Sequence, residues 1–255
     1  MSHFLKRIFQ ANFKLSLTFR LSFLSTLIVI FMKQVFFLTT WNFFFNKYRS
    51  IHGWDFNDML AMYGIVTFAI GFVELFFYGL KDLPRIVETQ QLDIFLLQPK
   101  NLILNIAISK GNLGGIAEMF LGIFLLAYSQ HLYSWKIPLI LPLAILFIFS
   151  LYLYLGSIAF FLRNSTGFIY ELYQNATIMA TQPNSAYNGL FWMIALTFLP
   201  TAYISYFPIE YLRTGVWVHL LYAISGGIVF FLVACWLFRL GLKRYESGYA
   251  IAQRF

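Results

Sequence analysis

The stretch "MLAMYGIVTFAIGFVELFFYGLKDLPRIVETQQLDIFLLQPKN", Met59 to Asn101, contains the contrast that decides the fold. Its first 22 residues carry a single charged residue, Glu74, whereas the 21 residues from Lys81 to Asn101 carry six. A bilayer core of roughly 30 Å is crossed by about 20 mostly apolar helical residues. The first part therefore predicts a membrane-spanning helix, and the second predicts a polar segment outside the membrane.

The composition of the whole chain also indicates a membrane protein. The 255 residues are 60% hydrophobic and 11% charged, whereas soluble domains contain about 25% charged residues. The net charge of +8 does not indicate nucleic acid as a partner, because the basic residues stand in short clusters at the ends of apolar runs. The surplus apolar surface must face the lipid bilayer.

Six apolar runs are long enough to cross the membrane, which predicts an all-α membrane protein with a single domain over residues 1–255. Transmembrane helices are expected because lipid offers no hydrogen-bond partner to open backbone groups. The six predicted spans are residues 21–45, 59–80, 102–128, 137–162, 190–207 and 217–238.

The positions of lysine and arginine predict the orientation. Of the 18 such residues, two lie within predicted spans and twelve fall on the side that carries the N-terminus. The other side receives four, namely Lys47, Arg49, Lys136 and Arg213. Cytoplasmic loops carry the excess of positive charge, so both the N-terminus and the C-terminus are predicted to be cytoplasmic.

The polar segment between spans two and three has the pattern of a short amphipathic helix. Asp82 is placed to cap its N-terminus, Pro84 is tolerated in a first helical turn, and Pro99 ends it. Leucine, isoleucine and valine recur near helical spacing over Leu83 to Leu97. The pattern predicts either a helix with a partner at the inner surface or a solvated connector.

Two other segments lie outside the regular spans. Residues 168–179 predict a second helix at the inner surface. The sequence "PTAYISYFPIEYLR", Pro200 to Arg213, has two prolines and no room for a full span. It predicts a re-entrant or interfacial element between spans five and six.

Motifs for chemistry on this chain are absent. There is no GxxxxGK[ST] phosphate loop, no HExxH pattern and no cysteine–histidine cluster with metal-ligand spacing. We therefore predict no catalytic residues and no metal site. In "GNLGG", Gly111 and Gly115 form a small-xxx-small pair that favours close helix packing.

Four ionisable residues fall inside the predicted spans: Lys33, Glu74, Lys110 and Glu118. Such residues usually pair inside a bundle. Counting about 1.5 Å per residue places Lys33 and Glu118 roughly 18 and 24 Å above the inner helix ends, and Glu74 and Lys110 roughly 9–12 Å above them. We predict Lys33–Glu118 and Glu74–Lys110 pairs, across helices or across a dimer, which either stabilise the fold or line a polar path.

Three segments resemble one family of transport proteins. The end of the chain, "RLGLKRYESGYA" from Arg239 to Ala250, is similar to the "GL-basic-basic-Tyr-x-Ser-Gly" tail of type-2 ATP-binding-cassette (ABC) export permeases of the viologen-exporter-like branch. The segments "LDIFLLQPKN" (Leu92–Asn101) and "LPTAYISYFP" (Leu199–Pro208) resemble two further motifs of that branch. Tyr249 departs from the small or amide residue that relatives often carry. The resemblance covers nearly the whole chain.

This resemblance implies the transmembrane subunit of an ABC exporter in the cell inner membrane, with no enzyme activity of its own. A second permease subunit, in a homodimer or heterodimer, and two ABC ATPase subunits would be its partners. ATP and Mg²⁺ would bind to the ATPases, and ATP-driven closure would move the bundle from inward-facing to outward-facing. The implied coupling helix places six residues at the ATPase: Leu83, Arg85, Ile86, Glu88, Asp93 and Leu97.

Two other classes of function fit the sequence less well. An ATP-independent secondary transporter or channel would need no ATPase and often contains inverted repeats, which are not visible in the sequence. A membrane-embedded lipid-modifying enzyme would need converging acidic or histidine residues, for which Glu74 and Glu118 are the candidates. The sequence does not indicate which substrate is transported.

Overall fold

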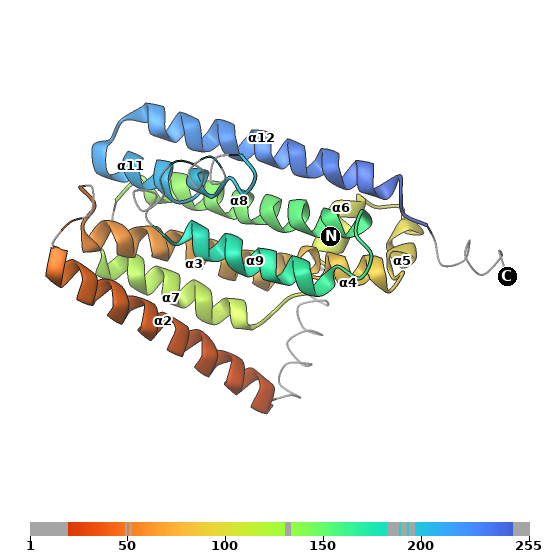
Figure 1. The fold of residues 1–255 in the computed structure, drawn as a ribbon, viewed down its shortest axis with the longest axis horizontal. Helices are drawn as coiled ribbons and strands as arrows, with labels where there is room; N and C mark the ends of the chain where they lie inside the picture. Colours follow the sequence, from red (N-terminus) through yellow and green to blue (C-terminus); the bar gives the residue numbers. More distant parts are fainter. Residues whose placement is uncertain are drawn as a thin grey trace.

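The computed structural model describes residues 20–48, 50, 53–130, 134–182, 189, 193 and 197–246. These residues form helices that run mostly along one axis, with short helices gathered at one end (Figure 1). The long helices are α2 (Arg20–Tyr48), α3 (Phe56–Phe77), α7 (Gly114–Tyr128), α8 (Ile137–Ser157), α9 (Thr166–Ala180) and α12 (Trp217–Leu242). The shorter elements are η1 (Tyr78–Leu80), α4 (Leu83–Glu88), α5 (Leu92–Leu96), α6 (Leu102–Ala107), η2 (Ile158–Phe160), η4 (Thr201–Tyr203) and α11 (Tyr206–Thr214).

Four helical segments of the described chain are long and apolar enough to cross a membrane: Ile28–Tyr48, Phe56–Glu88, Ile137–Phe160 and Trp217–Leu242. They correspond to the first, second, fourth and sixth predicted spans. The protein is therefore a multi-pass membrane protein, and the regular secondary structure of its described part is helical throughout. The total of six spans and the orientation stay predictions.

The third predicted span, 102–128, is wrong as a continuous helix. It is divided into α6 and α7 by the non-helical stretch 108–113. In this break Asn112 donates its backbone N–H to the Glu74 carbonyl at 2.9 Å, and its side chain binds the Glu74 carboxylate. The backbone can leave the helix here because protein groups replace the lost helical hydrogen bonds.

Of the fifth predicted span, 190–207, residues 190–192 and 194–196 lie outside the described residues. The described stretch 197–207 is not one continuous helix, because turns lie before and after η4 and α11 begins only at Tyr206. The predicted surface helix at 168–179 is a helix, α9, but it packs beside α8 and does not lie on a surface away from the bundle. Its Tyr173 hydroxyl donates to the Tyr152 carbonyl of α8 at 3.0 Å. The 200–213 segment, predicted to be re-entrant or interfacial, forms η4 and α11, and Gly215 ends α11 with φ of +71°.

Glycines determine how closely α3 and α7 pack. A Cβ atom on Gly71 would lie 2.6 Å from the Gly115 carbonyl oxygen, and one on Gly122 would lie 2.6 Å from the Phe68 nitrogen. Both distances are too short for any residue larger than glycine without a backbone shift. The close pair on α7 is thus Gly115 with Gly122, whereas Gly111 precedes that helix.

Residues of α3 pack on α7, α8 and α11, and most of its side chains are buried. A capping box begins this helix, with Asp55 and Asp58 each accepting a backbone N–H from the other, at 2.8 and 3.2 Å. Most of the side chains described on α2 are exposed, and this helix lies at the edge of the bundle (Figure 1). An apolar exposed helix of this length fits a lipid-facing position.

Candidate functional site at the α4 end of the bundle

The ends of the bundle differ in structure. One end, here called the α4 end, contains α4, α5, α6 and the last turn of α12; α11 lies toward the opposite end (Figure 1). At that opposite end Arg213 binds Asp58 at 3.0 Å and Glu210 at 2.8 Å. The Trp54 indole also donates to Glu210, at 3.0 Å. These contacts fasten α11 to the start of α3.

Asp82 connects several elements at the α4 end. Its carboxylate is buried and accepts two hydrogen bonds from Arg85, both at 2.9 Å. It also accepts one from the Tyr170 hydroxyl at 3.2 Å and one from the Lys110 ammonium group. Asp82 was predicted to cap the following helix, but its side chain makes no capping hydrogen bond. It joins α4, α9 and the α6–α7 break instead.

Glu74 holds a second set of polar contacts, one turn away from the end of α3. It pairs with Lys81, accepts from Asn112 at 3.0 Å and accepts from the Tyr152 hydroxyl at 3.2 Å. The predicted Glu74–Lys110 pair is therefore wrong, since Lys110 binds Asp82. The prediction assumed an unbroken helix, whereas the 108–113 break carries Lys110 out of the helix and toward α4.

The structure brings the other predicted pair together. Lys33 of α2 and Glu118 of α7 approach to 4.0 Å between Nζ and Oε1. The Lys33 side chain is 54% exposed and the Glu118 side chain only 10%. The pair thus has one buried member and one member at the outer surface of this chain.

Residues 81–97 form two short helices. After α4 the chain turns through Gln90, whose φ is +59°, and then begins α5. The prediction of a single amphipathic helix is wrong in this respect. Leu83, Ile86 and Leu92 are buried, whereas Ile94 and Leu97 are 61% and 86% exposed. The apolar residues therefore lie on two surfaces, one that packs on the bundle and one that faces away from it.

The six predicted coupling residues divide in the same way. Leu83 and Ile86 are buried in the core and cannot contact another protein in this arrangement. Arg85 is held by Asp82, and Glu88 accepts the Thr166 backbone N–H at 2.7 Å at the start of α9. Leu97 is the one of the six with a large exposed apolar side chain. Ile94, which the prediction did not include, lies beside it on α5.

The end of α12 packs on this same region. A side chain at Gly241 would collide with the Phe160 ring, and the Arg244 guanidinium lies 5.0 Å from the centre of the Phe161 ring. Burial and the neighbouring Asp93 carboxylate raise the pKa of the Tyr245 hydroxyl. Asp93 of α5 thus lies near Tyr245 of the C-terminal motif.

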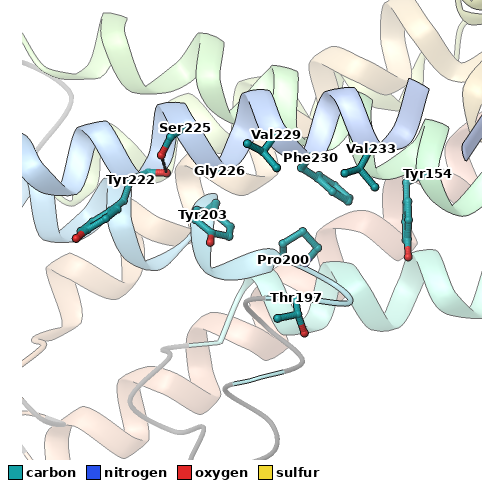
Figure 2. Close-up of a pocket in the computed structure, with 10 residues that line it drawn as sticks. All are labelled: Tyr154, Thr197, Pro200, Tyr203, Tyr222, Ser225, Gly226, Val229, Phe230 and Val233. Carbon is teal, nitrogen blue, oxygen red and sulfur yellow. Dashed lines mark hydrogen bonds between the residues drawn. The ribbon is translucent and has the colours of Figure 1, made fainter. Parts of the chain in front are cut away.

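A groove lies farther along the bundle, between η4, α8 and α12. Its volume is about 280 Å³, and Tyr154, Tyr203, Tyr222 and Phe230 are among the residues that line it (Figure 2). A side chain at Gly226 would collide with the Tyr203 ring, so glycine allows η4 to approach α12 closely. The described residues that line the groove are mainly aromatic and aliphatic, and none of them is charged.

A family model of ABC-2 transporter proteins matches residues 27–248. The match spans α2 to the end of α12 and includes both the α4–α5 segment and the C-terminal motif. The chain belongs to the ABC-2 family of transporter proteins. Comparison with curated proteins and with solved structures finds no match.

Membership of the ABC-2 family indicates what kind of partner protein this permease has. Proteins of this family are membrane components of ABC transporters and are associated with ABC ATPase subunits; they are generally not catalytic themselves. Among the described residues of this ABC-2 permease, no group of three or more His, Cys, Asp or Glu residues could hold a metal ion.

Asp82 should be essential for the stability of this ABC-2 permease. Asp82→Asn leaves the cations of Lys110 and Arg85 without their buried carboxylate. Because these side chains are 34% and 48% exposed, water offsets part of the loss, and the cost should be about 1.5–3 kcal/mol. We expect a clear fall in the unfolding temperature, measured in detergent. The double variant Asp82→Asn/Lys110→Met removes one of the two unpaired charges and should recover part of the loss. No recovery would mean that the Lys110 contact does not matter.

Proposed function

We propose that this chain is the permease subunit of an ABC exporter that moves its substrate outward by alternating access. ATP and Mg²⁺ bind to separate ATPase subunits, which supply the energy. The chain resides in the inner, cytoplasmic membrane with both termini in the cytoplasm. Family membership supports the transporter role, and the construction of the α4–α5 segment supports the coupling to an ATPase.

The distribution of basic residues supports a cytoplasmic α4 end. Lys81, Arg85, Lys243 and Arg244 lie at this end of the bundle, together with the basic residues just before α6, in the last turn of α12 and between α8 and α9, namely Lys100, Arg239 and Arg163. The α11 end carries few basic residues, and Lys136 and Arg213 among them make intramolecular bonds. Positive charge collects on the cytoplasmic side of membrane proteins.

The α4–α5 segment is suited to transmit force, and this observation carries the proposal. A coupling element needs a firm connection to the bundle and a free surface for its partner. Buried Leu83 and Ile86, together with the Asp82 contacts, provide the connection. Ile94 and Leu97 provide the free surface, because exposed leucine and isoleucine side chains at a polar end of the molecule are typical of an interface.

Two polar features support a second permease subunit. On α9, Glu171, Gln174 and Asn175 are exposed, although Tyr173 between them is buried against α8. On α2, Lys33 is half-exposed. Charged and polar side chains inside a membrane face protein or a water-filled cavity in preference to lipid. We therefore place a second subunit, and with it a polar path, against these faces.

Co-purification tests the proposed function without knowledge of the substrate. The tagged full chain is isolated from its native membranes, and ATP hydrolysis by the isolated complex is measured in lipid nanodiscs. We expect an ATPase with a phosphate loop to co-purify and to hydrolyse ATP faster with the permease than alone. Isolation of the intact chain without any ATPase, together with no effect of ATP on its conformation, would contradict the proposal.

A further inference from the structure

Another polar cluster lies at the place where α2, α3 and α7 meet, away from the α4 end. Gln34 of α2 is 2% exposed and Glu118 of α7 is 8% exposed. The Tyr63 hydroxyl of α3 interacts with both of these side chains. The coupling surface described above does not include any of these three residues.

Two acceptor atoms in this cluster have no hydrogen-bond donor among the described residues. They are Gln34 Oε1 and Glu118 Oε2, and both are buried. An unpaired polar atom in a low-dielectric interior costs roughly 1–3 kcal/mol, and more when the group is charged. The Tyr63 hydroxyl and the Gln34 amide N–H groups are donors in this cluster, but neither satisfies these two oxygens. A proton on Glu118 Oε2 would convert one of these acceptors into a donor and would remove a buried negative charge.

The cations around Glu118 only partly balance the negative charge of its carboxylate, which favours binding of such a proton. The charged groups that act on it are Lys33 from α2, Glu74 from α3 and Lys81 from the turn after η1. Tyr63 of α3 and Tyr152 of α8 also face it. Lys33 is only half-buried at 4.0 Å, and Lys81 is directly paired with Glu74. The buried carboxylate is thus incompletely balanced by cations, and a second carboxylate acts against its ionisation.

We propose that Glu118 is a proton-binding site in the membrane part of this permease. The carboxylate takes up one H⁺ from the aqueous phase onto Oε2 to give the neutral acid, and deprotonation returns that H⁺ to water. Glu74, the carboxylate that acts on Glu118, lies in the last turns of α3, toward the α4 end of the bundle. The site requires neither a particular substrate nor the ATPase.

Infrared difference spectroscopy of the full chain in nanodiscs tests the site directly, with the proton as the probe. Spectra recorded from about pH 5 to 9, the range in which buried carboxyl groups titrate, should contain a carboxylic-acid carbonyl band that shifts in D₂O. Glu118→Gln should lose this band. Glu171→Gln, which changes an exposed glutamate on α9, should retain it. An unchanged band in a folded Glu118→Gln protein would overturn the proposal.

A second variant keeps the test decisive if Glu118→Gln does not fold. Lys33→Met removes the cation at 4.0 Å, and a neighbouring opposite charge moves a carboxyl titration by about 1 pH unit or more. The midpoint of the infrared band should therefore rise by about 1 pH unit. A midpoint that does not move would overturn the assignment to Glu118. Because neither readout involves ATP or transport, failure here leaves the proposed exporter function intact.

Discussion

Replacing Gly71 with alanine is expected to destabilise the whole bundle. The added methyl group would lie 2.6 Å from both the Gly115 carbonyl oxygen and the Met119 nitrogen. Both are backbone atoms, so α7 must move as a unit. Overpacking of this kind costs about 1–3 kcal/mol, which corresponds to a fall in the unfolding temperature of roughly 2–12 °C. Thermal unfolding in detergent, followed by tryptophan fluorescence, measures it.

The effect should increase when Gly122 is also replaced. The two glycines lie on opposite helices of the same α3–α7 interface. A shift of α7 relieves both collisions in part, so the two costs should overlap. The double alanine variant should lose more stability than either single variant but less than the sum of the two losses. We expect it to be recovered poorly, or only in aggregated form, from membranes.

Gly227→Ala is the matched control. Gly227 also lies inside a membrane helix, α12, but no atom of another described segment lies within 4 Å of an added Cβ. The unfolding temperature of this variant should not fall. Equal losses for Gly71→Ala and Gly227→Ala would show that helix contact is not the cause and would contradict the proposed α3–α7 packing.

Replacing both Ile94 and Leu97 with glutamate should separate ATP hydrolysis from transport. Central apolar anchors of an interface are each worth more than about 1 kcal/mol. The loss of two, together about 2–4 kcal/mol, would weaken ATPase binding roughly 30- to 700-fold. Because both side chains are exposed, the permease itself should fold normally. Binding of the purified ATPase to nanodiscs that contain the variant measures the loss.

Tyr128→Glu provides a control with a similar exposed side chain, 65% accessible, at the end of α7 that lies away from α4. This variant should bind the ATPase with unchanged affinity. If Ile94→Glu/Leu97→Glu binds as strongly as Tyr128→Glu does, α5 is a connector and not a docking element.

The sequence was sufficient to predict the elements that depend on local patterns. The helices α2, α3, α8 and α12 lie within a few residues of predicted spans, because each is a long apolar run that backbone hydrogen bonding forces into a helix. The Lys33–Glu118 approach was also predicted, from the depth counted along the first and third predicted spans, although the third is broken at 108–113. These inferences used only the rise per residue and the cost of charge in lipid.

The sequence was not sufficient where contacts between distant residues decide the structure. The break at 108–113 depends on Glu74 and Asp82, which bind Asn112 and Lys110 from 28 to 38 residues away. Without this break, the partner of Lys110 was misassigned. Spacing also could not show that Leu83 and Ile86 face the core while Leu97 faces outward, because the turn at Gln90 reorients α5.

Site-directed crosslinking from position 97 tests the coupling role of the α4–α5 segment most directly. In a Cys235→Ser background, which removes the native cysteine, Leu97→Cys and Tyr128→Cys permeases are labelled with a photoreactive crosslinker in native membranes. We predict that position 97 crosslinks to an ATPase and that ATP changes the yield, whereas position 128 does not crosslink to it. An ATPase crosslink from position 128 but not from position 97 would contradict the proposed orientation and the proposed coupling surface.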